Sequence, residues 1–307
     1  MARVVLFGEC MLELQGQAFG SMQQGFGGDT LNTAVYLARC SAGKLQVGYA
    51  TALGDDGLST GLLTRWQAEA LDTSMVQRLS GRMPGLYLIE VDAQGERSFS
   101  YWRDNSAAKA YFDAPDTPLE QAADQIDALY LSGISLAILP VAGRERLLAL
   151  MARLRARGAT VVFDNNYRPR LWASRAEAHA WFDRAYALAS IALVTADDEQ
   201  ALRGLASLDE AVAAASALPC PEVVTKRGRA ATLVRTASGV QEIATERVDK
   251  VVDTTAAGDS FAAGYLAVRL QGGSVQAAAT QGNRLAARVI QHRGALIPVE
   301  TMADLVL

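Results

Sequence analysis

The sequence predicts an α/β protein: a three-layer α/β/α sandwich around a mostly parallel sheet, with a small β-sheet lid. Along most of the chain, short runs of β-branched and apolar residues alternate with segments of helical periodicity, a pattern typical of βαβ units. Two segments, near residues 9–26 and 84–105, lack helical periodicity and are expected to form the lid. The 307 residues are therefore expected to form one domain with this lid inserted in it.

The order of the elements follows from the same patterns. Strands are expected at residues 3–7, 46–53, 128–131, 160–163, 191–194 and 222–225. Helices are expected at residues 31–39, 62–71, 145–157, 176–188, 208–217, 261–270 and 276–291. In the lid, two strand-like runs flank Asp92-Ala-Gln-Gly95, which predicts a hairpin, and residues 11–26 are expected to add further antiparallel strands.

Composition argues against several classes of function. A net charge of −4, a pI near 5.4 and scattered arginines argue against nucleic-acid binding. No apolar run approaches the ~18 residues that span a membrane, and the first ten residues read as a strand rather than a secretory signal. The three cysteines form no CxxC pair and only two histidines are present, so neither a zinc site nor disulfides are expected. We expect a cytoplasmic, reducing location.

Residues 253–264, DTTAAGDSFAAG, place one acid among very small residues. Ala256, Ala257 and Gly258 would lie at a helix N-terminus, where free N–H groups attract phosphate. Asp259, in the first turn, could then take a proton from an attacking alcohol. A helix cap with close packing would also account for these residues.

This stretch resembles the second signature of the ribokinase-like (PfkB) carbohydrate kinases, although that family more often has Gly at the position of Ala256. Gly27-Gly28 and Asn32 resemble its first signature, and the resemblance covers essentially the whole chain. It implies a ribokinase-like fold, ATP as phosphoryl donor and Mg²⁺ as cofactor. It further implies that Asp259 is the catalytic base, beside an anion hole formed by the backbone N–H groups of Ala256, Ala257, Gly258 and Asp259.

The resemblance also implies further binding residues. For ATP these are Asn166, Arg168, Thr225, Lys226, Gly228, Ala257, Gly258 and Asn283. Glu199 is implied to hold magnesium indirectly, through water, within a motif in which Ala196 replaces the family's Asn.

Residues 97–103, RSFSYWR, bear on the substrate. Strand alternation places Phe99, Tyr101 and Arg103 on one face, with Tyr87 on the partner strand, and a guanidinium matches a carboxylate. An edge strand with an aromatic cluster explains the same pattern. The stretch resembles the 2-keto-3-deoxygluconate kinase branch, which implies ATP-dependent phosphorylation of that sugar acid to 2-keto-3-deoxy-6-phosphogluconate. The substrate-binding residues so implied are Gly28, Asn32, Tyr87, Tyr101, Trp102, Arg103, Arg168 and Asp259.

Other functions remain open at this stage. Residues 164–168 fit fructokinase-like, neutral-sugar relatives equally well, and a sugar-binding protein derived from a kinase is a further alternative. Gly57-Leu-Ser59-Thr-Gly61 matches the nucleophile elbow of acyl hydrolases, with His292 downstream, but Asp55 and Asp56 separate the serine from the strand. The chain has no GxxxxGK[ST] and no GxGxxG after its first strand. The exposed sides of the lid need covering, and the resemblance implies a homo-oligomer, at least a dimer.

Overall fold

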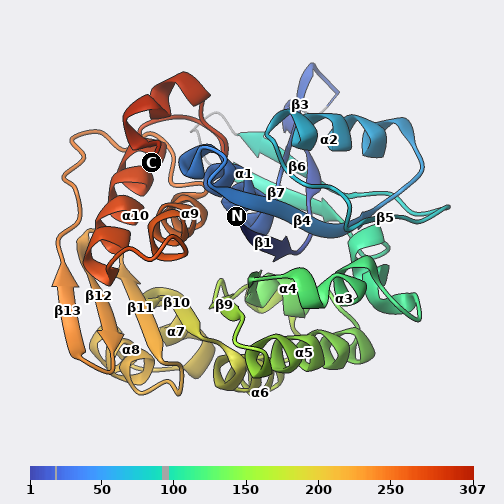
Figure 1. The fold of residues 1–307 in the computed structure, drawn as a ribbon. Coiled ribbons are helices and arrows are strands. Elements are labelled where there is room, and N and C mark those ends of the chain that lie inside the picture. Colours follow the sequence, from blue (N-terminus) through green and yellow to red (C-terminus); the bar gives the residue numbers. More distant parts are fainter. Residues whose placement is uncertain (18, 92–96) are drawn as a thin grey trace.

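The computed structural model describes residues 1–17, 19–91 and 97–307 (Figure 1). Its centre is a nine-stranded sheet formed within these residues. From one edge to the other the strands are β13 (Gly239–Ile243), β12 (Ala230–Thr236), β11 (Glu222–Arg227), β10 (Ile191–Thr195), β9 (Thr160–Asp164), β8 (Ala128–Ser132), β1 (Ala2–Phe7), β4 (Leu45–Leu53) and β5 (Val76–Arg78). Neighbours from β11 to β5 pair in parallel, whereas β12 and β13 are antiparallel.

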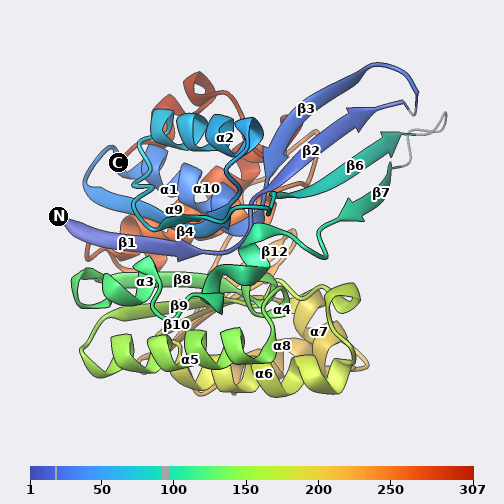
Figure 2. The same ribbon diagram turned by 90° about the vertical axis from the view of Figure 1, so that its right-hand side faces the viewer.

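Helices cover both faces of this sheet (Figures 1 and 2). One face carries α1 (Asp29–Ser41), α2 (Gly57–Ala68), α9 (Ala257–Arg269) and α10 (Val275–Val289). The other face carries α3 (Pro118–Gln121), α4 (Gly133–Ala137), α5 (Val141–Ala156), α6 (Arg175–Leu188), α7 (Ala196–Arg203) and α8 (Leu208–Ser216). Short 3₁₀ turns lie at Ala107–Asp113, Ala123–Gln125, Pro169–Leu171 and Val299–Leu305.

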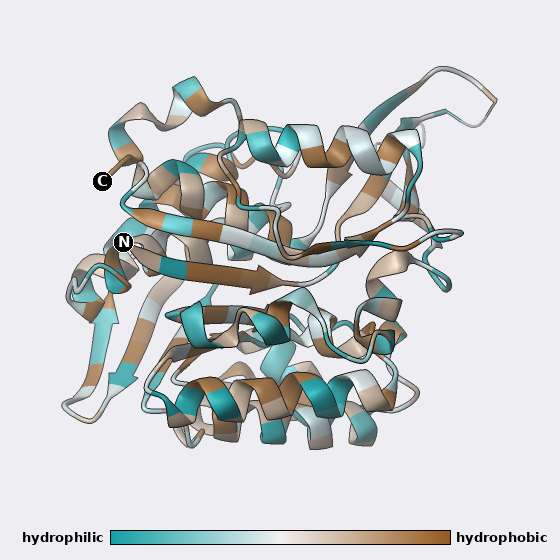
Figure 3. Cartoon of the chain, turned by 45° about the vertical axis from the view of Figure 1, so that its right-hand side comes forward, coloured by the Kyte–Doolittle hydropathy of each residue, from teal (hydrophilic) through white to brown (hydrophobic). Residues whose placement is uncertain are grey.

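Burial on both faces explains why the central strands are apolar almost throughout. Residues Val4–Phe7 of β1 and Val47–Leu53 of β4 are buried along their whole length. Figure 3 shows hydrophobic colour concentrated on β1 and alternating colours on the helices. Large aromatic side chains, such as Trp66 against Tyr49, fill the space between a helix and the sheet. The predicted three-layer fold is confirmed.

A second, four-stranded sheet forms the lid. Its order is β3 (Met22–Gly27), β2 (Met11–Gly16), β6 (Gly85–Val91) and β7 (Arg97–Trp102), and Figure 2 shows it projecting from the body. The two outer pairings are antiparallel, as predicted. The central β2–β6 pairing is parallel, so the prediction of an all-antiparallel lid is wrong. The predicted turn at Asp92–Gly95 lies outside the described residues.

Two other differences have local causes. Helix α2 begins at Gly57, five residues before its predicted start, because Asp56 caps it: the Ser59 backbone N–H donates to Asp56 Oδ1 at 2.9 Å. Strands β12 and β13 were not predicted; they form an antiparallel pair that extends the sheet beyond β11.

Candidate active site

The predicted catalytic acid lies where two helix N-termini meet the carboxyl ends of the sheet strands. Asp259 is in the first turn of α9, and Asn32 of α1 donates from Nδ2 to its Oδ2 at 2.8 Å. Thr33 Oγ1 also donates to the backbone carbonyl of Asp259, at 3.3 Å. The two signature stretches, more than 200 residues apart, are thereby in direct contact.

The electrostatic surroundings of Asp259 suit a proton acceptor. Burial, and next the nearby Asp29 carboxylate, raise the pKa of Asp259 from 3.8 to about 7. The hydrogen bond from Asn32 acts in the opposite direction and favours the charged form. A carboxyl group with a pKa near neutral pH holds a proton firmly once it has accepted one, and it is still ionised in much of the population.

The start of α9 presents free backbone N–H groups beside this acid. Among the described residues, the N–H groups of Gly258 and Asp259 donate no hydrogen bond. The preceding loop is held by Asp253, whose Oδ1 accepts from the Thr255 N–H at 3.0 Å. Ala256 precedes the helix at φ 60°, in the left-handed region that glycine occupies without strain. A helix N-terminus with free N–H groups is a site for a phosphate.

A buried cation lies close to these N–H groups. Lys226, at the end of β11, donates from Nζ to Asp164 Oδ2 at 2.9 Å, and both side chains are largely buried. A Cβ placed on Gly258 would lie 3.6 Å from the same Nζ. The ammonium group therefore lies beside the N-terminus of α9, within reach of an anion bound there.

A cavity of about 1040 Å³ opens beside Lys226 and the N-terminus of α9. Five of the residues predicted to bind ATP line it: Lys226, Gly228, Ala257, Gly258 and Asn283. Sequence reasoning missed other lining residues, among them Thr195, Phe261, Ile290 and the basic Arg229 and Lys250. The cavity thus runs from an apolar wall between α9 and α10 to the free N–H groups, dimensions and chemistry that suit a nucleotide.

Three of the predicted ATP-binding side chains lie elsewhere. Thr225 is buried in β11, and it is not in the cavity wall. Asn166 donates from Nδ2 to Asp29 Oδ2 at 2.7 Å, which places it toward the first signature. The Arg168 side chain is half exposed and forms a 3.4 Å ion pair with Asp198.

Glu199, predicted to hold magnesium through water, lies inside the protein. Its side chain is fully buried, Arg203 donates to Oε1, and Tyr186 donates to Oε2 at 2.9 Å. Each oxygen of Glu199 therefore accepts one hydrogen bond from the protein, and its role toward magnesium stays a prediction. Asp198 is the acid of α7 that faces the sheet edge, since it accepts from the Tyr167 N–H at 3.2 Å, and burial raises its pKa.

The lid supplies the side of the site opposite α9. Tyr87 and Tyr101 are directly paired across β6 and β7, with ring centroids 6.0 Å apart. A Cβ on Gly27 would lie 3.2 Å from Tyr87 Oη and 3.9 Å from Asn32 Oδ1, so this face of the lid lies near the asparagine that holds Asp259. Tyr87 donates to Glu13, and burial with that carboxylate raises the pKa of Tyr87.

The other residues predicted to bind substrate, Gly28, Arg103 and Trp102, do not all lie on one side of the lid. Gly28 is needed for close approach, because a Cβ there would lie 2.2 Å from the backbone oxygen of Glu9. Arg103 lies at the base of the lid and forms an ion pair with Glu9. Trp102 is 59% exposed and, by alternation, lies on the face opposite Tyr101. The structure therefore does not place Trp102 with the other predicted substrate contacts.

Ser59, the serine of the hydrolase-like motif, helps to hold the start of α2. Its side chain is buried and donates to Asp56 Oδ2 at 2.6 Å, while it accepts from the Gly54 N–H at 3.0 Å. His292 bonds through Nδ1 to the Arg288 carbonyl of its own helix end. The serine is part of the N-cap of α2, so the hydrolase alternative is wrong.

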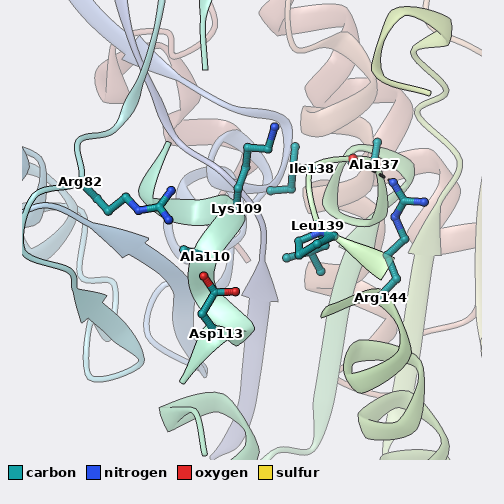
Figure 4. Close-up of a pocket in the computed structure, with 9 residues that line it drawn as sticks. Arg82, Lys109, Ala110, Asp113, Ala137, Ile138, Leu139 and Arg144 are labelled. Carbon is teal, nitrogen blue, oxygen red and sulfur yellow. Dashed lines mark hydrogen bonds between the residues drawn. The ribbon is translucent and has the colours of Figure 1, made fainter. Parts of the chain in front are cut away.

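A second cavity, of about 390 Å³, shares no lining residue with the first (Figure 4). Arg82, Lys109 and Asp113 line it on one side and residues 137–140 on the other. Arg144 at its edge is already bound, donating to the Leu136 carbonyl at 2.9 Å and to Glu177 at 2.6 Å. This cavity contains none of the predicted site residues.

Comparison with known proteins agrees with the two signatures. A model of the pfkB family carbohydrate kinases matches residues 1–302. The chain belongs to this family. A protein of Dickeya dadantii (strain 3937) named 2-dehydro-3-deoxygluconokinase is 48% identical over 304 residues, which cover 97% of this chain and 98% of the relative.

Solved structures of carbohydrate kinases show the same fold. The crystal structure of 2-dehydro-3-deoxygluconokinase from Thermotoga maritima has a TM-score of 0.84 at 22% identity, covering 99% of this chain and 98% of that one. A putative ribokinase II from E. coli in complex with ATP and Mg²⁺ has a TM-score of 0.81 at 20% identity, covering 96% of this chain and 94% of that one. Among the described residues of this chain, no helix is long and apolar enough to cross a membrane.

Proposed function

We propose that this carbohydrate kinase transfers the γ-phosphoryl group of ATP to 2-keto-3-deoxygluconate (2-dehydro-3-deoxygluconate) and forms the 6-phosphate. The contact between Asn32 and Asp259, at the N-terminus of α9, carries the kinase chemistry. The relative that is 48% identical over nearly its whole length supports this substrate over fructose or another neutral sugar.

Asp259 is the general base of the proposed reaction. Its carboxylate takes the proton of the substrate's terminal hydroxyl as that oxygen attacks the γ-phosphorus, and ADP leaves. The free N–H groups of Gly258 and Asp259 and the Lys226 ammonium stabilise the negative charge on the transferred group. Asn32 holds the carboxylate in position through its 2.8 Å hydrogen bond.

Mg²⁺ supplies charge neutralisation on the phosphates of ATP. The described residues contain no group of three or more His, Cys, Asp or Glu side chains that could hold a metal ion. Mg²⁺ prefers few protein ligands and keeps phosphate oxygens and water, so it fits this site as an ion carried mainly by ATP. Glu199 is proposed to act on it through water, as its motif implies, and Asp198, the preceding residue in the first turn of α7, faces the sheet edge at Tyr167.

The lid is proposed to recognise the sugar acid. Arg103 offers N–H groups to the carboxylate, and Tyr87 and Tyr101 cover the sugar from the same face. Arg168 and Asn166 are proposed to act from the sheet edge, and Gly28 allows the chain to pass close to the bound substrate. Distance from Arg103 to Asp259 would then select which hydroxyl reacts.

The single-domain organisation, with a lid formed from residues 9–26 and 84–105, is part of the proposal. So are a cytoplasmic location and a homo-oligomer in which a second lid covers the face of this lid that carries Trp102, which is 59% exposed.

Initial rates of ADP release test the proposal. With Mg-ATP, 2-keto-3-deoxygluconate, gluconate, fructose and ribose are compared at equal concentrations. We expect kcat/KM for the keto-deoxy acid to exceed that for the others by about 100-fold, or ~2.7 kcal/mol in transition-state terms. A preference for fructose or ribose would leave a carbohydrate kinase whose substrate is not the one proposed.

A further inference from the structure

The strongest unexplained group outside the catalytic centre is the carboxylate of Glu9. It lies in the link between β1 and β2, and its side chain is only 1% exposed. Its Oε2 accepts a hydrogen bond from Arg103 Nη2. Its Oε1 is also buried, and no described residue donates to it. Arg103 is therefore the donor on which this buried charge depends.

The Glu9–Arg103 pair lies where the chain segments that join the body to the lid come together. A Cβ on Gly85, the first residue of β6, would lie 2.8 Å from Glu9 Oε1 and 3.1 Å from Arg103 Cβ. Gly28, which follows β3, approaches more closely still: a Cβ there would lie 2.2 Å from the Glu9 backbone oxygen. Glu9 thus touches the strand links on both sides while it holds the arginine that follows β7.

The pairing leaves part of the guanidinium available. An arginine has five N–H donors, and here only Nη2 has an acceptor among the described residues. Nε and Nη1 have none there, although the side chain is only 12% exposed. A long side chain at the base of a lid would otherwise adopt many rotamers, and fixing one of them lowers the entropic cost of binding an anion.

We propose that Glu9 is a positioning residue for substrate selection: its buried carboxylate fixes Arg103 so that the remaining guanidinium N–H groups bind the carboxylate of an acidic sugar. This inference rests on the proposed function. Glu9 acts through Arg103 and does not touch the reacting atoms.

A double-variant cycle tests it with Glu9→Gln, Arg103→Gln and the two combined. For Glu9→Gln we expect KM for 2-keto-3-deoxygluconate to rise about tenfold, with kcat and the KM for Mg-ATP within about twofold of wild type. Arg103→Gln should raise the same KM further. Because Glu9 acts through Arg103, the double variant should have the KM of Arg103→Gln alone.

Thermal unfolding gives an independent readout. Arg103→Gln leaves a buried carboxylate without its cation and should lower Tm by about 5 °C or more. Adding Glu9→Gln should restore most of that loss. Glu69→Gln, which breaks the Arg39–Glu69 pair away from the site, is the matched control: its Tm should fall while KM stays unchanged.

The outcomes separate the two proposals. A Glu9→Gln enzyme with lowered Tm and unchanged KM has lost a structural contact only, which would overturn the inference. KM effects that multiply in the double variant would show that Glu9 acts independently of Arg103, and equal KM effects in Glu69→Gln would show a nonspecific cause; both would overturn it too. If the wild-type enzyme prefers a neutral sugar, the proposed function is wrong, and the inference about Glu9, which rests on it, is wrong too.

Discussion

Replacing Asp259 with asparagine should lower the activity of the enzyme and raise the stability of its fold. The substitution keeps the size of the side chain and an oxygen that can accept from Asn32, but it removes the base. We expect kcat to fall by about 100-fold or more with sugar binding nearly unchanged. The same change should make the folded protein more stable at alkaline pH.

The sign follows from the raised pKa of Asp259. The folded protein binds this proton more tightly than the unfolded chain does, because its pKa is about 7 against 3.8. Ionised Asp259 therefore destabilises the folded state, a cost that is absent below about pH 4 and complete above pH 7. About three pKa units at 1.36 kcal/mol each give an upper limit of ~4 kcal/mol. For a chain of this length that corresponds to a Tm increase on the order of 5 °C at pH 8.

Two measurements test the role of Asp259 as base and its raised pKa. Differential scanning calorimetry of wild type and Asp259→Asn at pH 8 should show the higher Tm for the variant, and the difference should shrink as the pH is lowered toward 4. Wild-type kcat/KM should fall as the pH drops below about 7, since the base becomes protonated. Normal turnover by the variant, or a Tm below that of wild type at pH 8, would refute the reasoning.

Three further substitutions test single contacts. Ala256→Gly should raise Tm and keep turnover, because an L-residue at φ 60° costs about 1 kcal/mol; a lower Tm would contradict this. Ser59→Ala should keep turnover and lower the free energy of unfolding by about 1–2 kcal/mol, measured in urea, because the buried Gly54 N–H loses its acceptor and Asp56 loses the hydroxyl hydrogen bond; inactivity without destabilisation would give Ser59 a chemical role. Lys226→Met should raise KM for Mg-ATP about tenfold in initial-rate assays, with partial recovery in Lys226→Arg. A KM unchanged in Lys226→Met would remove the ammonium group from the phosphate site.

Elements that bury both faces of a parallel sheet could be predicted from the sequence, because burial makes their apolar runs continuous. The lid could be located but its pairing could not. Strands β2 and β6 are joined in parallel by residues about 70 positions apart, and local periodicity carries no information on that partner. The β12–β13 pair was missed because no helix separates it from β11, so the alternation of strands and helices gave no signal.

Among the site residues too, some could be predicted from the sequence and others could not. Asp259 and Asn32 could be predicted because each belongs to a short contiguous signature. Glu9–Arg103 and Asp164–Lys226 join residues 94 and 62 positions apart, and neither pair has a local pattern. An acid directly after a buried strand was the available signal for Glu9, since the carboxyl ends of parallel strands are where ligands bind. For Glu199 the motif gave a role but did not show that Arg203 and Tyr186 would bind its carboxylate, because a motif does not show which way a helical side chain points.

The small residues around Asp259 serve packing as well as the proposed phosphate binding. A Cβ on Gly264 would lie 2.9 Å from the Gln281 carbonyl, so this glycine allows α9 and α10 to lie against each other. Phe261, on the same helix, lines the larger cavity, which is proposed to hold ATP. Close packing of the helix body fixes where its N-terminus lies relative to Lys226 and Asn32. The same small residues therefore have two effects. They allow the helix to pack closely, and they leave its N-terminal N–H groups accessible to a phosphate.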